Sequence, residues 1–272
     1  MSSASSMIFQ REKPSGKLSH VIDEYTYRAI TFHEKDSIRK EMPCRHINSI
    51  DFFLAGQYTT TDVQSKQNVP FARTTIRGPR TCRKYSITIE QDFVCFSIRF
   101  KPTGIYELLG IPMSEFSNRA IDATDVFPGL FKTLTEKLLG ATDLFSCIAI
   151  VEPLLLKQLR NYYTVSSYTS KLAAYIVNEN TNVRLTSLYK DIPFSSRHIE
   201  RSFIKEVGIT PKMYSDVVRF SKVLQTKKDH PREKWSSLAY DHHYFDQMHL
   251  IKDFKRFLGI NPGQFRLSEF AL

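Results

Sequence analysis

The C-terminal part of the chain repeats itself at an offset of 51 residues, and this repeat restricts the possible folds more than any other feature. Eight positions match in chemical character. The matching pairs are Ser195 and Asp246, Ile199 and Leu250, Phe203 and Phe254, Val207 and Leu258, Gly208 and Gly259, Ile209 and Ile260, Pro211 and Pro262, and Tyr214 and Phe265. Such a period predicts one supersecondary unit that is built twice.

The repeated positions define the unit. Ser195 and Asp246 are good N-caps, because their side-chain oxygens can accept a hydrogen bond from the backbone at the start of a helix. Three apolar residues spaced by four then form one buried stripe. Glycine suits the left-handed residue that ends the helix, and the later proline suits the first turn of the next helix. A short helix precedes each capped helix, with Leu185 and Leu188 in the first copy and Trp235, Leu238 and Ala239 in the second. The unit is therefore a helix-turn-helix.

The second helix of such a motif enters the major groove of DNA. We expect base contacts from the positions outside the apolar stripe: Arg197, His198, Arg201, Gln247, Met248, His249 and Lys252. We expect phosphate contacts, which weaken with salt, from Ser196, Lys205, Lys255 and Arg256. Gln247 can bond adenine through two hydrogen bonds, and Met248 can contact a thymine methyl group. The alternative for each charged residue is an ordinary solvated helix face, and for each histidine a structural or phosphate-facing role.

A long helix is predicted between the two units, from Pro211 to about Thr226. Its length is roughly 24 Å at the usual rise per residue. Recognition helices that read successive major grooves on one face of DNA lie about 34 Å apart. The connecting helix and the widths of the units together make that separation feasible.

This region, over about 167–272, resembles the AraC/XylS family of bacterial transcription regulators. The resemblance is carried by residues 195–203, 208–211, 219–220, 246–255 and 259–262. It implies a DNA-binding domain with two helix-turn-helix units joined by a long helix. Residues 99–102 and 108–112 also resemble the sensor half of some members.

Two residues depart from the family pattern. His243 stands before Tyr244 where the family usually has glycine, and Tyr189 stands where many members have alanine. Histidine enters the left-handed region more readily than most residues, so we expect the turn to form with some strain. Tyr189 requires a shifted packing of the first helix. The alternative function is therefore a ligand-sensing or protein-interaction module whose DNA binding is weakened or lost.

The first hundred residues predict strands. Apolar side chains alternate with polar ones over 94–100 and 85–89, and weaker strand candidates lie at 25–32, 50–54 and 71–76. Helical spacing follows, and the three predicted helices are one around Ile105–Leu109 ending at Gly110, one from Leu130 to Leu139 ending at Gly140, and one over 143–159 that contains Pro153.

The predicted fold class is an α+β N-terminal domain plus an all-α C-terminal domain. The first, a β-rich sheet or barrel followed by helices, covers 1–160; a linker covers 161–170; the domain with two helix-turn-helix units joined by a long helix covers 171–272. We expect the N-terminal domain to control DNA binding through a small-molecule effector in the sheet, with Arg77 and Arg80 as candidates, or by pairing two protomers through 130–159. An activator would also contact RNA polymerase.

Charge and the remaining motifs agree with a cytoplasmic regulator of double-stranded DNA. The net charge is +10, and residues 151–272 carry 19 basic and 12 acidic side chains against 19 and 16 in residues 1–150. No apolar stretch reaches the roughly 20 residues that cross a bilayer, so no membrane partner is expected. We expect no enzyme, cofactor or metal, because catalytic and phosphate-binding motifs are missing and the four cysteines are dispersed, which predicts reduced thiols.

Overall fold

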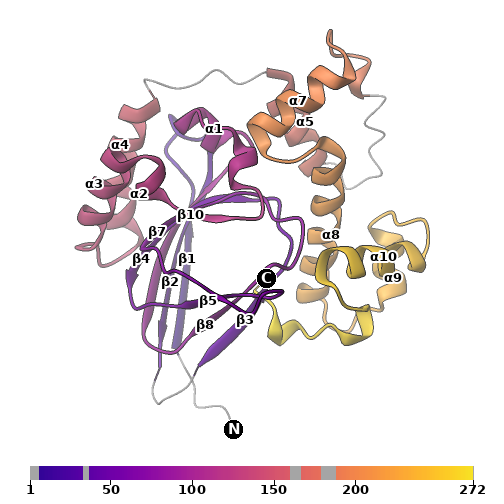
Figure 1. The fold of residues 1–272 in the computed structure, drawn as a ribbon, viewed down its shortest axis with the longest axis horizontal. Coiled ribbons are helices and arrows are strands. Elements are labelled where there is room, and N and C mark those ends of the chain that lie inside the picture. Colours follow the sequence, from indigo (N-terminus) through magenta and orange to yellow (C-terminus); the bar gives the residue numbers. More distant parts are fainter. Residues whose placement is uncertain (1–5, 33–36, 160–166, 179–187, 272) are drawn as a thin grey trace.

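A computed structural model describes residues 6–32, 37–159, 167–178 and 188–271. Two β-sheets and the first helices form the N-terminal part, and helices form the C-terminal part (Figure 1). This confirms the predicted fold class. No helix among these residues is long and apolar enough to cross a membrane. All four cysteines are free.

The larger sheet has six antiparallel strands in the order β1-β2-β9-β4-β7-β10. Their bounds are β1 Ser6–Glu12, β2 Ile22–Thr31, β9 Phe93–Phe100, β4 Asn48–Ala55, β7 Thr74–Arg77 and β10 Ala120–Asp122. The second sheet, in the order β3-β8-β5-β6, consists of β3 Ile38–Met42, β8 Tyr85–Ile89, β5 Thr59–Asp62 and β6 Asn68–Val69. The strands predicted over 25–32, 50–54, 85–89 and 94–100 are confirmed, whereas β7 begins three residues later than the predicted start at Phe71.

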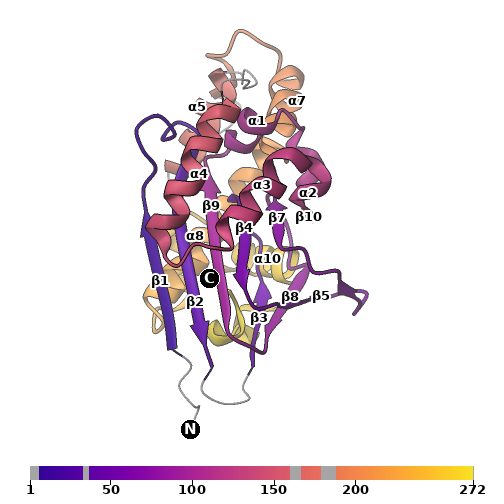
Figure 2. The same cartoon turned by 90° about the vertical axis from the view of Figure 1, so that its left-hand side faces the viewer.

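One face of the larger sheet forms the main core. Alternation in β9 buries Phe96, Ile98 and Phe100 on this face. The helices pack over it, as Figure 2 shows for α3 and α4. Their bounds are α1 Gly104–Leu109, α2 Ala123–Val126, α3 Pro128–Leu138 and α4 Leu144–Leu159, with the short η1 Met113–Phe116 between α1 and β10. The three predicted helices are confirmed; Gly110 ends α1 with a positive φ of 71°, and Pro153 lies inside α4.

The C-terminal helices form two cores on either side of a long helix. The elements are α5 Ser167–Asn178, α7 Ser196–Val207, α8 Pro211–Asp229, α9 Trp235–Asp241, α10 Gln247–Leu258, η2 Pro262–Gln264 and η3 Leu267–Glu269. The predicted connecting helix is confirmed as α8, which has 19 residues and is about 28 Å long. Pro262 begins only a short 3-10 turn, because η2 stops after three residues.

Part of the predicted linker is helical. Residues 167–170 form the first turn of α5, and residues 161–166 lie outside the described residues. Leu185, expected in the first helix of the first unit, is also outside them, while Leu188 and Tyr189 are helical.

The two parts of the chain are joined by direct hydrogen bonds. Ser117 Oγ donates to the Gly208 carbonyl at the end of α7 over 2.6 Å. The backbone N–H of Arg83 donates to the Phe257 carbonyl in α10 over 2.7 Å, and that of Ala271 donates to the Glu41 carbonyl in β3 over 2.9 Å. The N-terminal part thus contacts the C-terminal end of both capped helices.

Candidate DNA-binding interface

The helix α7 has the predicted start, stripe and end. The Ser195 hydroxyl accepts a hydrogen bond from the backbone N–H of His198 at 3.3 Å. Ile199, Phe203 and Val207 are fully buried, and Gly208 closes the helix with φ 108°. The side chains on the opposite face of α7 are therefore available to contact a partner molecule.

The helix α10 is built in the same way. The Asp246 carboxylate accepts a hydrogen bond from the backbone N–H of His249 at 2.7 Å. The apolar stripe is buried, and Gly259 closes the helix with φ 70°. A carboxylate at this end is also favoured by the helix dipole. The repeat therefore yields two helices with the same design.

The unusual turn of the second unit forms as expected. His243 has φ 55°, in the left-handed region, and is exposed. Its backbone N–H donates to the Tyr240 carbonyl at 3.0 Å, and that of Tyr244 donates to the Ala239 carbonyl at 2.9 Å. The turn is closed by these bonds, so histidine replaces glycine here without loss of the helix-turn-helix geometry.

The side chain of Tyr189 is partly buried. It packs against the core of the first unit, and burial, followed by the nearby Glu200 carboxylate, raises the pKa of its hydroxyl to about 12. Most of the helix that should carry Tyr189 lies outside the described residues, so the predicted shift of that helix stays a prediction.

Most of the predicted base-contacting residues project into solvent. The exposed ones are Arg197, Arg201, Gln247, Met248 and Lys252. They share two helix faces that lie opposite the buried stripes, as the repeat requires. These faces supply charge, amide hydrogen-bonding groups and one apolar side chain, which are the groups that contact base edges.

The two histidines are held by their own units. The ring of His198 stacks on Phe194 with 4.7 Å between centroids. The ring of His249 lies edge-on to Tyr244 at 5.0 Å, and its Nε2 is 3.4 Å from an Arg219 guanidinium nitrogen. These contacts favour the structural alternative for both histidines over base contact.

The predicted phosphate-contacting residues do not form one group. Ser196 and Lys255 are exposed, and neither side chain forms a hydrogen bond or ion pair with another described residue. Lys205 lies with its ammonium group over the ring of Tyr106 in the N-terminal part, at 5.4 Å. Arg256 forms an ion pair with Asp216 in α8 at 3.0 Å. Arg256 therefore ties α10 to α8, a role that its position in the sequence did not indicate.

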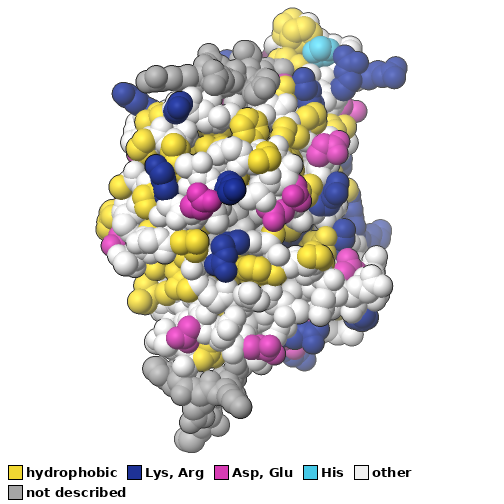
Figure 3. All heavy atoms as spheres, turned by 60° about the vertical axis from the view of Figure 1, so that its left-hand side comes forward, with side chains coloured by type: hydrophobic (Ala, Val, Ile, Leu, Met, Phe, Trp, Pro, Cys, Tyr) yellow, Lys and Arg dark blue, Asp and Glu magenta, His cyan; other side chains and the backbone are white. Residues whose placement is uncertain are grey.

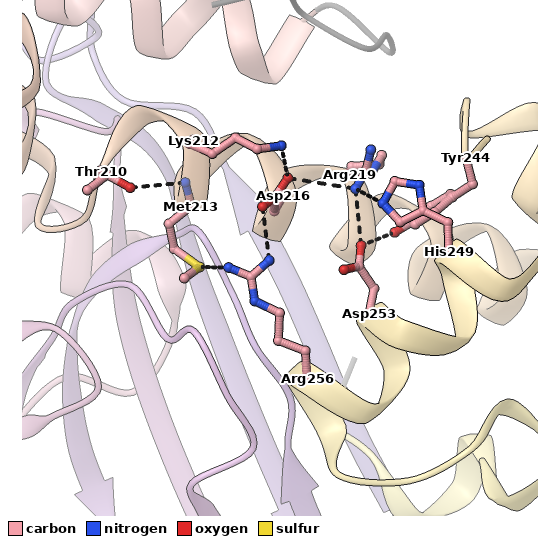
Figure 4. A network of polar contacts seen from close by, with 9 residues as sticks. All are labelled: Thr210, Lys212, Met213, Asp216, Arg219, Tyr244, His249, Asp253 and Arg256. Carbon is pink, nitrogen blue, oxygen red and sulfur yellow. Dashed lines mark hydrogen bonds and ion pairs between the residues drawn. The ribbon is translucent and has the colours of Figure 1, made fainter. Parts of the chain in front are cut away.

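A buried network of charges continues this link between α8 and α10 (Figure 4). The Arg219 guanidinium lies 3.2 Å from an Asp253 carboxylate oxygen and 3.7 Å from Asp216. Asp253 also accepts a hydrogen bond from the Tyr244 hydroxyl at 2.9 Å, and the guanidinium lies over the Tyr244 ring at 4.2 Å. Burial, followed by the Asp253 carboxylate, raises the pKa of Tyr244, so its hydroxyl remains a donor.

This network fixes α10 on the connecting helix α8. Arg219 and Asp253 lie within the segments that carry the family resemblance, yet their pairing spans 34 residues and no local spacing predicts it. Sequence spacing signals only the contacts within α8, which are Lys212 with Asp216, four residues apart at 2.9 Å, and Asp216 with Arg219, three residues apart at 3.7 Å.

Two family models match the chain. A helix-turn-helix domain matches residues 189–268, which include α7, α8 and α10. A domain of unknown function (DUF6597) matches residues 10–122, which hold most of the two sheets. No curated protein matches the sequence.

The solved structures that are similar to this chain are distant in sequence. ToxT from Vibrio cholerae O395 covers 98% of this chain and 99% of its own, with 10% identity and a TM-score of 0.46. ToxT from strain SCE256 with a bound unsaturated fatty acid covers 98% and 96%, with 11% identity and a TM-score of 0.45. The AraC-like transcriptional activator CuxR covers 81% and 95%, with 13% identity and a TM-score of 0.25. The helix-turn-helix match over residues 189–268 is therefore the finding that bears on the C-terminal part.

Proposed function

We propose that this chain is an AraC-type transcription regulator that binds a specific DNA sequence with α7 and α10 in successive major grooves, and the helix-turn-helix match over residues 189–268 supports this proposal. The observation that carries this proposal is the pair of capped helices, which share one design and keep their polar faces exposed. A cytoplasmic location follows from this role.

The rigid connection between the helices supports their joint action. The helix α8 spans about 28 Å, and the network around Arg219 and Asp253 attaches α10 to it. Two helices that are fixed relative to one another meet two grooves at a defined spacing, about 34 Å for one turn of DNA. The ordering cost of binding the second groove is then small.

Selection of genomic fragments by the full-length protein tests this proposal. A specific site should bind at least about 10³-fold more tightly than bulk DNA at physiological salt. A preference below about tenfold would contradict the proposal and favour the alternative of a sensing or interaction module. Genes beside the recovered sites would also indicate the signal.

We further propose that the sheet face opposite the main core senses an anionic effector. Arg99 in β9 and Arg77 in β7 pair with Ser49 in β4, so the two arginines lie on one face. Arg77 forms an ion pair with Asp51 at 2.8 Å, and Arg80 donates to the Pro43 carbonyl at 3.0 Å. Both predicted effector residues thus already have partners within the protein.

Arg45 is the better effector candidate. Its backbone pairs with that of Arg80, and it forms no ion pair among the described residues. Burial, followed by the charges of Arg99 and Arg80, lowers its pKa to about 9. An anion would relieve this repulsion. Binding of organic acids should therefore raise the melting temperature of the wild type and should not raise that of Arg45→Gln; equal shifts in both would contradict the assignment.

The helices α3 and α4 are proposed to pair two protomers. Apolar side chains gather in patches on this face of the molecule (Figure 3). Leu139, directly after α3, and Phe145, in the first turn of α4, are exposed. Phe145→Lys should lower the dimer fraction in sedimentation experiments. An unchanged mass would contradict this interface. Contact with RNA polymerase is proposed only if the protein activates transcription.

A further inference from the structure

Phe194 and Phe245 occupy the same position of the repeat, directly before the N-caps of α7 and α10. An apolar residue at this position often packs on the fourth residue of the helix, which fixes the entry of the chain. Phe245 does not do so: its side chain is 92% exposed, whereas Leu250, the fourth residue of α10, is fully buried by other groups. The fold therefore makes no use of the Phe245 ring.

The equivalent ring in the first unit is used by the fold. Phe194 stacks on His198 with 4.7 Å between centroids and 21° between planes, and it lies 5.2 Å from the ring of Tyr168. It is 48% exposed. Phenylalanine at this repeat position thus packs on neighbouring rings in the first unit and is exposed to solvent in the second.

Further exposed apolar side chains lie close to Phe245 in the chain. Met248, in the first turn of α10, is 59% exposed, and Tyr240, near the end of α9, is 83% exposed. Three of the ten exposed large hydrophobic residues of the described chain therefore fall within nine consecutive positions around the start of α10. Exposed apolar side chains that lie together are typical of a contact surface.

The location of this group indicates DNA as the partner. The N-terminal residues of a recognition helix are the ones that approach base edges in the major groove. Thymine alone presents an apolar group there, its 5-methyl group, which apolar side chains contact. The neighbouring Gln247 is exposed in the same turn and suits adenine, the partner of thymine.

We propose that Phe245 and Met248 contact the 5-methyl groups of thymines in the half-site of α10, and that these contacts determine its specificity. The first unit has no such contact, because Phe194 is stacked on His198. This inference rests on the proposed function, namely that both helices lie in major grooves.

Deoxyuridine substitution tests the proposal, because it removes only the methyl group and keeps the base pair. Thymines of the selected site are replaced in one half-site at a time, and the dissociation constant of the full-length protein is measured. Loss of methyl contacts should weaken wild-type binding about three- to tenfold in one half-site and less than about twofold in the other. A selected site without recurrent thymine in either half-site, or equal tolerance of deoxyuridine in both, would overturn the proposal.

Matched variants assign the effect to the two side chains. Phe245→Ala and Met248→Ala should each bind the thymine site more weakly and should lose sensitivity to deoxyuridine in the same half-site. Phe194→Ala, the repeat-equivalent control, should keep that sensitivity. Because Phe245 and Met248 are exposed, their variants should melt like the wild type.

The outcomes separate this inference from the function on which it rests. If no specific DNA site exists, the proposed function fails. If a specific site exists but Phe245→Ala and Met248→Ala retain the full deoxyuridine effect, only the methyl-contact proposal fails. If both variants bind that site normally and lose transcriptional activation, the exposed group contacts a protein, and the proposal is again overturned.

Discussion

The two helix-turn-helix units are alike within their recognition helices and differ in how those helices are attached. Both α7 and α10 begin at a side-chain cap and end at a glycine with positive φ. The end of α7 accepts a hydrogen bond from Ser117 of the N-terminal part, whereas α10 is joined to α8 through Arg219 and Arg256. The helix design is thus local and repeated, while the side-chain contacts that place each helix are not repeated.

This difference has a consequence for control of DNA binding. The N-terminal part contacts α7 through the Ser117 hydroxyl and α10 through the Arg83 backbone, and Ala271 bonds to β3. The network with α8 resists movement of α10 alone. We therefore expect the first unit to respond more to the N-terminal part than the second unit does.

The largest expected effects test whether the buried aromatic residues of the two units contribute equally to stability. Phe203→Ala and Phe254→Ala should each lower the free energy of unfolding by about 3–5 kcal/mol, because each removes a buried aromatic ring. Both side chains are fully buried, against Tyr214 in one unit and against Phe220 in the other. Denaturant unfolding followed by circular dichroism measures the loss.

Arg201→Ala and Lys252→Ala are the matched controls for these variants. Both side chains are exposed, so each should change the free energy of unfolding by less than about 0.5 kcal/mol. If the four variants lose equal stability, the assignment of buried and exposed helix faces is wrong.

The next largest effect should be confined to the second unit. Arg219→Met leaves the buried carboxylate of Asp253 without its cation and should cost about 2 kcal/mol. The cost is limited because the Tyr244 hydroxyl still donates to Asp253, and Arg256 still pairs with Asp216. DNA footprinting should show weaker protection in the half-site of α10 alone.

Asp253→Asn in the Arg219→Met background provides the control. Removing both charges should cost less than the sum of the two single changes, because the double variant leaves no uncompensated charge. Additive losses, or equal weakening of both half-sites, would contradict a role of this network in placing α10.

The third effect concerns DNA affinity. Arg201→Ala and Lys252→Ala should weaken binding to the selected site by about 1–2 kcal/mol each, because the two residues are equivalent by the repeat. Titrations at several salt concentrations distinguish the type of contact. Loss of a phosphate contact lowers the salt slope by about one and weakens binding to all sequences alike, whereas loss of a base contact changes the sequence preference. An effect in only one variant would show that the units bind DNA differently.

The features that could be predicted from sequence are those determined by neighbouring residues. The caps Ser195 and Asp246 and the buried stripes follow from spacing and residue type. The left-handed conformation of His243 follows from the family resemblance, which implies glycine at that position. Strand β9 was equally clear, since its alternation matches one buried face.

The features that could not be predicted depend on distant residues or on exposure. All seven residues of the edge strand β1 are exposed, so it shows no alternation of buried and exposed positions. The strand β3 has the sequence IRKEM, whose three consecutive charged residues show no alternation of apolar and polar positions. Arg256 was expected at phosphate, but its partner Asp216 lies 40 residues earlier. Phe245 is equivalent to Phe194 by the repeat, but the sequence does not indicate its role. Only the structure shows that the Phe194 ring is packed and the Phe245 ring is exposed.

The smallest expected effect concerns acid and the first unit. His46 lies edge-on to the ring of Tyr214 at 5.9 Å, and its Nδ1 is buried without a hydrogen-bond partner among the described groups. Burial, followed by the charges of Arg45 and Lys222, lowers its pKa from 6.5 to about 4. The folded protein therefore keeps this ring neutral, while the unfolded chain takes up a proton below about pH 6.5.

Because the unfolded state binds more protons between about pH 6.5 and about pH 4, the contribution of His46 to stability is present above this window and is lost as the pH falls through it. At pH 5.5 the loss should be about 1 kcal/mol. His46→Gln keeps a polar side chain that cannot titrate, so its stability should fall less than that of the wild type between pH 7 and pH 5.5, as measured by denaturant unfolding. Since His46 contacts Tyr214 of the first unit, acid should also weaken protection of the half-site of α7 before that of α10. Equal acid sensitivity of both half-sites, or an unchanged pH dependence in His46→Gln, would show that the N-terminal part does not act on the first unit through this histidine.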